Sequence, residues 1–88
     1  MTLSETVYLV RASAKSGNWI WVGGDQSKSL ARAGYWHFEV VAQGVAESNQ
    51  KKMDEELVSV YGSYRKNHIK FEVVPMLLKD IMIARLKG

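Results

Sequence analysis

Two residues near the middle of the chain, His37 and Glu39, are of the types that bind metals or transfer protons. They stand two positions apart on a predicted strand, so their side chains project from the same face. A catalytic zinc ion usually takes three protein ligands, and the second histidine, His68, falls in a predicted loop. We therefore interpret His37 and Glu39 as a polar pair on a solvated face, and the sequence predicts no metal and no cofactor.

An acidic run, Asp54-Glu55-Glu56, lies on a predicted helix. Consecutive residues of a helix point about 100° apart, so these carboxylates do not form a catalytic pair. The chain has no cysteine, which excludes thiolate catalysis and disulfide bonds. No serine lies in the Gly-x-Ser-x-Gly pattern of a nucleophile elbow. The sequence therefore predicts a protein that is not an enzyme and has no small-molecule substrate.

The segment from Trp19 to Ser29 has the order of a phosphate-binding loop: a strand, glycines, a Lys-Ser pair and a helix start. The spacing does not fit the Walker pattern. When Lys28 and Ser29 are aligned with that pattern, Val22 and Ser27 stand where the two glycines belong. We interpret the segment as a tight turn between a strand and a helix, with a weak anion site at Lys28 as the alternative.

Hydrophobic periodicity defines the elements that would position these residues. Alternating apolar residues predict strands over 7–10, 19–22, 35–42 and 69–73. Helical spacing and capping residues predict helices over 25–33, from about 48 to 61, and over 76–87, with Pro75 leading into the last one. The run 81–83 also fits a strand. The expected fold is α+β, a single domain of residues 1–88. It has a four-stranded, mostly antiparallel sheet, element order β-β-α-β-α-β-α, and helices packed on one face.

Composition narrows the class of protein further. The chain has 88 residues, 47% of them hydrophobic, and a net charge of +3, which is too apolar for a disordered protein. A domain of this size has a small core. No apolar stretch approaches the roughly 20 residues of a membrane span, and the N-terminus lacks the basic and apolar parts of a signal peptide. We expect no membrane association and a cytoplasmic location.

Apolar residues stand on both faces of the predicted strands. Trp19 and Trp21 share one face of their strand, and Ile20 and Val22 share the other. So short a chain has too few helices to cover two sheet faces, and exposed apolar surface marks association sites. The sequence therefore predicts a non-enzymatic protein-binding module, acting on a partner protein or as a homodimer. A small inhibitor, adaptor or accessory protein of a phage or mobile element fits a domain of this size with no catalytic motif.

The predicted partner-binding residues are of three kinds. Aromatic residues on strands are the expected anchors, apolar residues on the outer face of the last helix add a patch, and basic residues at the rim guide the encounter with the partner. They are Trp19, Trp21, Tyr35 and His37; Met76 and Ile83; and Arg32, Arg65 and Lys66. The alternative is that these aromatic side chains fill the small core or pair across strands.

Single-stranded nucleic acid is the second predicted partner. Aromatic side chains on a sheet can stack on unpaired bases. From residue 64 on, the sequence has six basic and two acidic residues, which would attract phosphates. Steep loss of affinity with salt would distinguish this hypothesis from docking onto an apolar protein surface.

Overall fold

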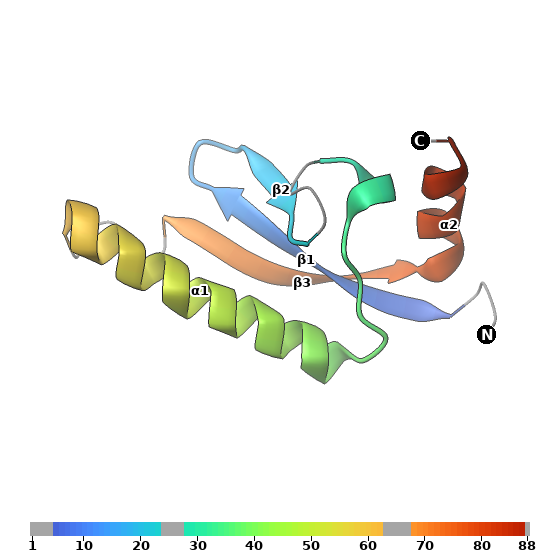
Figure 1. The fold of residues 1–88 in the computed structure, drawn as a ribbon, viewed down its shortest axis with the longest axis horizontal. Coiled ribbons are helices and arrows are strands. Elements are labelled where there is room, and N and C mark those ends of the chain that lie inside the picture. The colour runs from blue at the N-terminus through green and yellow to red at the C-terminus, as the bar shows by residue number, and fades with distance from the viewer. Residues whose placement is uncertain (1–4, 24–27, 63–67, 88) are drawn as a thin grey trace.

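A three-stranded antiparallel sheet carries two helices in the computed structural model, which describes residues 5–23, 28–62 and 68–87. The elements in chain order are β1 (Thr6–Ala14), β2 (Trp19–Trp21), the 3-10 turn η1 (Leu30–Arg32), α1 (Glu39–Tyr61), β3 (Ile69–Leu77) and α2 (Leu78–Lys87). The strand order is β2-β1-β3, so β1 is central and the other two strands are edges (Figure 1).

β1 and β2 form the predicted hairpin. The amide of Ala14 donates to the carbonyl of Asn18 at 2.8 Å, and the amide of Gly17 donates to the carbonyl of Ala14 at 3.0 Å. Gly17 has a φ of 97°, a conformation that glycine adopts without steric cost. The register pairs Arg11 with Trp21, so the tryptophans of β2 share a face with the odd-numbered residues of β1.

β3 is longer than predicted and includes Pro75. Pro75 stands opposite Tyr8, whose amide and carbonyl both bond Trp36 on the far side of β1, at 2.8 and 2.9 Å. The backbone nitrogen of Pro75 therefore faces away from β1, and the missing N–H costs the sheet no hydrogen bond. The prediction of a helix from residue 76 is thus wrong at its start, because the chain stays extended to Leu77.

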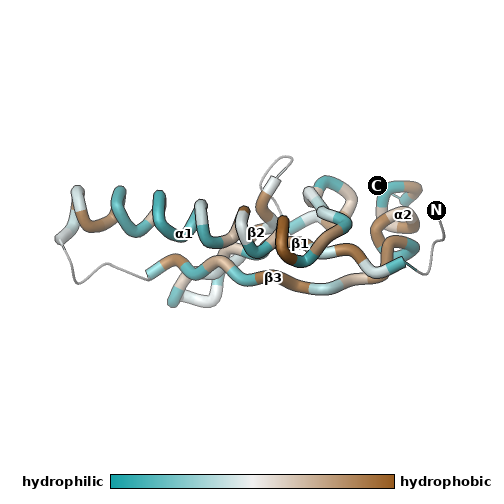
Figure 2. Tube along the Cα trace, turned by 90° about the horizontal axis from the view of Figure 1, so that it is seen from below, coloured by the Kyte–Doolittle hydropathy of each residue, from teal (hydrophilic) through white to brown (hydrophobic). Residues whose placement is uncertain are grey.

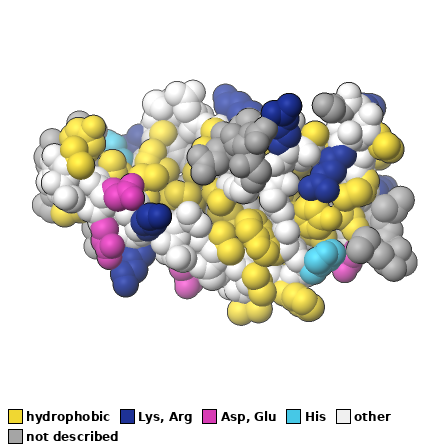
Figure 3. Space-filling model, in the orientation of Figure 1, with side chains coloured by type: hydrophobic (Ala, Val, Ile, Leu, Met, Phe, Trp, Pro, Cys, Tyr) yellow, Lys and Arg dark blue, Asp and Glu magenta, His cyan; other side chains and the backbone are white. Residues whose placement is uncertain are grey.

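The molecule is long and flat. Its principal extents are 46 × 26 × 17 Å, and its radius of gyration is 14.2 Å, against about 12 Å for a compact domain of this length. The cause is α1, whose 23 residues span about 35 Å. Figures 1 and 2 show the C-terminal part of this helix extending past the β1–β2 hairpin, and Figure 3 shows hydrophobic side chains at that end. Within the described residues, no helix is long and apolar enough to cross a membrane.

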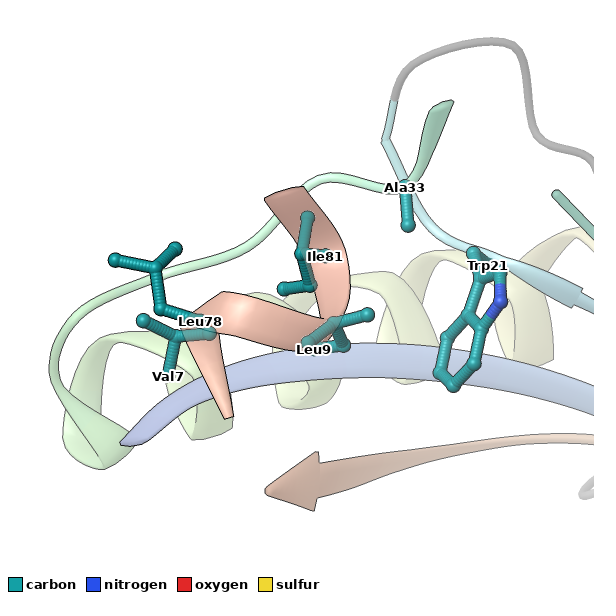
Figure 4. Close-up of a cluster of buried hydrophobic side chains, with 6 residues drawn as sticks. All are labelled: Val7, Leu9, Trp21, Ala33, Leu78 and Ile81. Carbon is teal, nitrogen blue, oxygen red and sulfur yellow. The ribbon is translucent and has the colours of Figure 1, made fainter. Parts of the chain in front are cut away.

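The buried residues form two clusters, on the two faces of β1. Val7 and Leu9 pack with Trp21, Ala33, Leu78 and Ile81, as Figure 4 shows. Val10 packs with Ala42 and Ala46 of α1. Because alternate residues of a strand point to opposite faces, α2 and α1 cover different faces of β1. The prediction that all helices pack on one face is wrong.

The largest error concerns the predicted strand over 35–42. Only Trp36 takes part in the sheet, as a single bridge to Tyr8, and α1 begins at Glu39 rather than near residue 48. Ala42 and Ala46 are four residues apart and therefore share a helical face. Both are buried, at 0% and 7% exposure, and their small side chains let the helix backbone approach β1 closely. This packing outweighs the strand propensity of the neighbouring valines.

Two further elements differ from the expectation. The helix predicted over 25–33 is a single 3-10 turn, Leu30–Arg32, in its described part; residues 25–27 lie outside the described residues. The sheet therefore has three strands rather than four, and the predicted order β-β-α-β-α-β-α is replaced by β-β-α-β-α with the short turn η1 before α1. The α+β class is confirmed.

Candidate functional site

An apolar groove of about 500 Å³ lies between α1, the β1–β2 hairpin and the start of β3. Its walls are mostly aliphatic and aromatic side chains from four segments of the chain. They are Ala12, Ala14, Trp19, Ile20, Val22, Met53, Ile69 and Phe71. Volumes of about 300–1,000 Å³ with such a lining are typical of binding sites.

The groove is open because α1 lies toward β3. The side-chain amide of Gln50 donates to the carbonyl of Ile69 at 2.7 Å, and its oxygen accepts a hydrogen bond from the amide of Phe71 at 2.9 Å. These two bonds occupy the outer edge of β3, in the way that a neighbouring strand would. They hold the helix over one side of the sheet, so Ile20 and Val22, on the hairpin side, face the groove and are only partly buried.

Three polar side chains border the groove. Asn18 and Lys28 come from the hairpin side, and Asn49 comes from α1. The side-chain amide of Asn49 donates a hydrogen bond to the carbonyl of Val45 at 2.8 Å. Among the described residues that line the groove there is no carboxylate. The groove can therefore bind an apolar group beside a positively charged rim.

The described ranges hold no cluster of three or more histidine or acidic side chains that could bind a metal. The predicted pair of His37 and Glu39 does not form, since Glu39 belongs to α1 and accepts a hydrogen bond from Gln43 at 3.3 Å. His37 instead lies 3.5 Å from Glu5, measured from its Nδ1 to the carboxylate Oε1. Its ring also makes an edge contact with Tyr35 at a centroid distance of 5.7 Å.

The two tryptophans of β2 have different environments. Trp21 is 6% exposed and belongs to the core, so the structure places one predicted anchor inside the molecule. Trp19 is half-buried and meets Trp21 edge-on at 5.2 Å. The cationic groups of Arg11 and Lys28 each lie 5.8 Å from the centre of the Trp19 ring, and Arg11 also pairs with Glu72.

The other predicted partner-binding residues are spread over the molecule. Tyr35 is half-buried, with the Arg85 guanidinium 5.2 Å from its ring centre. Arg32 is exposed on η1. Met76 lies on β3 and packs against the α2 cluster, whereas Ile83 is 48% exposed on α2. These two residues therefore do not form the predicted patch on one helix face. Arg65 and Lys66 lie outside the described residues.

Sequence reasoning missed the exposed apolar residues of α1. Phe38, just before the helix, is 69% exposed, and Val40 and Val60 are 73% and 70% exposed. The helical spacing that marks Met53, Leu57 and Val60 as one apolar face could be read from the sequence. What the spacing does not reveal is that this face continues past the groove.

Comparison of the chain with family models, with curated proteins and with solved structures found no match.

Proposed function

We propose that this protein is a non-enzymatic protein-binding module, an adaptor or accessory protein that takes an apolar segment of a partner into the groove beside α1. One observation carries the proposal. The groove is lined mostly by apolar side chains on the hairpin side of the sheet, which α1 leaves open. The free energy falls when a partner covers apolar surface that is otherwise open to water.

The location of the surface differs from the predicted anchors. Trp21 lies in the core, so the proposal rests on Ile20, Val22 and Met53, with Trp19 at the border. The elongated shape supports it as well, because the long dimension of 46 Å gives the chain more surface than a compact domain of the same length. Lys28 provides a charge at the rim that would steer an acidic partner.

The experiment compares two phenylalanine substitutions at neighbouring positions of β1. Ala14 lines the groove, whereas Ser13, the next residue, points to the opposite face. Peptides are selected from a random library on the wild-type protein, and their affinity is then measured by calorimetry for Ala14→Phe and Ser13→Phe. We expect Ala14→Phe to weaken binding at least about tenfold, and Ser13→Phe to leave it near the wild-type value.

Thermal unfolding of both variants provides the control for folding. Peptides that bind Ala14→Phe as tightly as the wild type, while both variants fold, would show that the groove is not the docking site.

Single-stranded nucleic acid is the second candidate, and one observation favours it. Trp19 is half-buried beside two cationic groups, those of Arg11 and Lys28, at 5.8 Å each. An aromatic ring next to cations is the combination that binds a base and its phosphate. Loss of one stacked base costs about 1–3 kcal/mol, so Trp19→Ala should weaken oligonucleotide binding by about fivefold or more.

The test is fluorescence titration with an oligothymidine at two salt concentrations. Affinity that falls as salt rises, and that drops in Trp19→Ala, supports this candidate. Absence of any binding at low salt rules it out and leaves the protein partner.

A further inference from the structure

The apolar face of α1 continues beyond the groove. Ala42 and Ala46 pack on the sheet, and Met53 lines the groove. Leu57 and Val60 follow at spacings of four and three residues, so they lie on the same side of the helix. Leu57 is half-buried and Val60 is 70% exposed. We call residues 54–61, which come after Met53, the projecting half of α1.

The projecting half and the groove have opposite charge. Residues 54–61 include Asp54, Glu55 and Glu56 and no lysine or arginine. The groove has Lys28 on its border, and Lys15 is exposed in the adjoining hairpin turn. No carboxylate is present among the described residues of the groove lining. An acidic helix with an apolar stripe is therefore complementary to this groove.

The spacing of the sheet provides room for a second helix. Gln50 holds α1 at the outer edge of β3, and the groove extends from β3 across β1 to β2, which is two strands from β3. Two strand spacings are about 9.6 Å, and packed helices lie about 8–10 Å apart. A helix laid in the groove would thus pack against α1 and the sheet together.

We propose that the occupant of the groove is the projecting half of α1 from a second copy of this chain. This inference rests on the proposed function, because it names the partner of the same groove. Each copy offers one groove and one projecting helix, so two copies related by a twofold axis fill both grooves at once. Such an isologous interface closes on itself and stops at the dimer.

The test begins with sedimentation equilibrium of the full chain over a range of concentrations. Val60→Asp places a charge on the apolar stripe of the projecting half. Ser59→Asp is the matched control, since Ser59 is exposed on the adjoining position of the same helix. We expect a dimer for the wild type and for Ser59→Asp, and at least about 30-fold weaker dimerisation for Val60→Asp and for Ala14→Phe.

A mixing experiment tests the exchange of helix and groove directly. Val60→Asp retains an intact groove, and Ala14→Phe retains an intact helix. In an equal mixture, the intact helix of Ala14→Phe can bind the intact groove of Val60→Asp, which restores one of the two contacts of the dimer. The two variants together should therefore associate more tightly than either variant does alone. Dimers formed through any other surface would show no such gain, which would overturn the inference.

Other outcomes separate this inference from the proposed function. A wild-type chain that stays monomeric at about 1 mM, where even weak association is populated, refutes the second copy as occupant. If selected peptides still bind that monomer in a way that Ala14→Phe abolishes, the groove remains a docking site for a different protein. If those peptides bind Ala14→Phe as tightly as the wild type, the proposed function fails independently.

Discussion

The hydrogen bonds of Gln50 determine where the groove opens, and replacing this residue gives a quantitative test. Gln50→Leu removes the bonds to the carbonyl of Ile69 and from the amide of Phe71, together with the bond to the Asp54 carboxylate on the same helix. Each such bond contributes about 0.5–1.5 kcal/mol net. Since the site is only part-buried, water replaces some of the loss. We therefore expect the free energy of unfolding to fall by about 1–2 kcal/mol.

Urea denaturation followed by circular dichroism measures this change. For a domain of this length, about 1 kcal/mol corresponds to a melting temperature roughly 4–8 °C lower. Gln43→Leu is the matched control, because Gln43 is exposed on the same helix and its side-chain amide donates to Glu39, on that helix too, at 3.3 Å. The control should change stability by less than about 0.5 kcal/mol.

Gln50→Glu sharpens the test. The new carboxylate can still accept from the amide of Phe71, but it would face the carbonyl of Ile69 and the carboxylate of Asp54, which Gln50 now bonds at 3.1 Å. The variant should therefore be less stable than Gln50→Leu at neutral pH and recover stability when acid protonates the new group. If Gln50→Leu is as stable as Gln43→Leu, the placement of α1 over β3 does not depend on Gln50.

Three further substitutions test other parts of the fold by thermal unfolding. A Cβ at Gly44, inside α1, would have no neighbour within 4 Å, so Gly44→Ala should raise stability by about 0.5–1 kcal/mol; no change would contradict the helix there. Gly23 has a φ of 91°, and a Cβ added there would lie 3.1 Å from the Gly34 backbone. Gly23→Ala should therefore lower the free energy of unfolding by more than about 1 kcal/mol. Glu72→Gln should cost less than about 1 kcal/mol, since the side chains of Arg11 and Glu72 are 37% and 52% exposed; a larger loss would refute this.

The hairpin and the position of β3 could be predicted from the sequence because their signals are local. Trp19–Trp21 belongs to a β-branched and aromatic run next to a turn with Gly17, and β3 alternates from Ile69 onward. The far end of β3 could not be predicted in the same way. Pro75 favours a helix start, and only the pairing with β1 shows that its nitrogen faces outward.

The start of α1 was mispredicted because two local signals opposed a long-range contact. Val40 and Val41 favour a strand, and Gly44 is a weak helix former. What decides the conformation is the burial of Ala42 and Ala46 against Val10, a contact between segments more than 30 residues apart. Single-sequence periodicity contains no information about that contact.

The groove was only partly predictable. Alternation correctly places Ile20 and Val22 on the face opposite Trp21, and the surplus of apolar surface predicts a docking site. The burial of Trp21 was not predictable, because it depends on Ala33 and the two α2 residues that share its cluster. Nor was the location of the opening, since Gln50 meets β3 across 19 and 21 residues of sequence.

Methyl NMR of the methionine side chains tests the central claim, that the groove beside α1 is the docking surface. Met53 lines the groove, whereas Met76 and Met82 pack against the α2 cluster and serve as internal references. On titration with a bound partner, whether a selected peptide or further copies of this chain, the account predicts that the Met53 methyl resonance shifts while those of Met76 and Met82 stay in place. A binding partner that shifts Met76 or Met82 and leaves Met53 unchanged would contradict it.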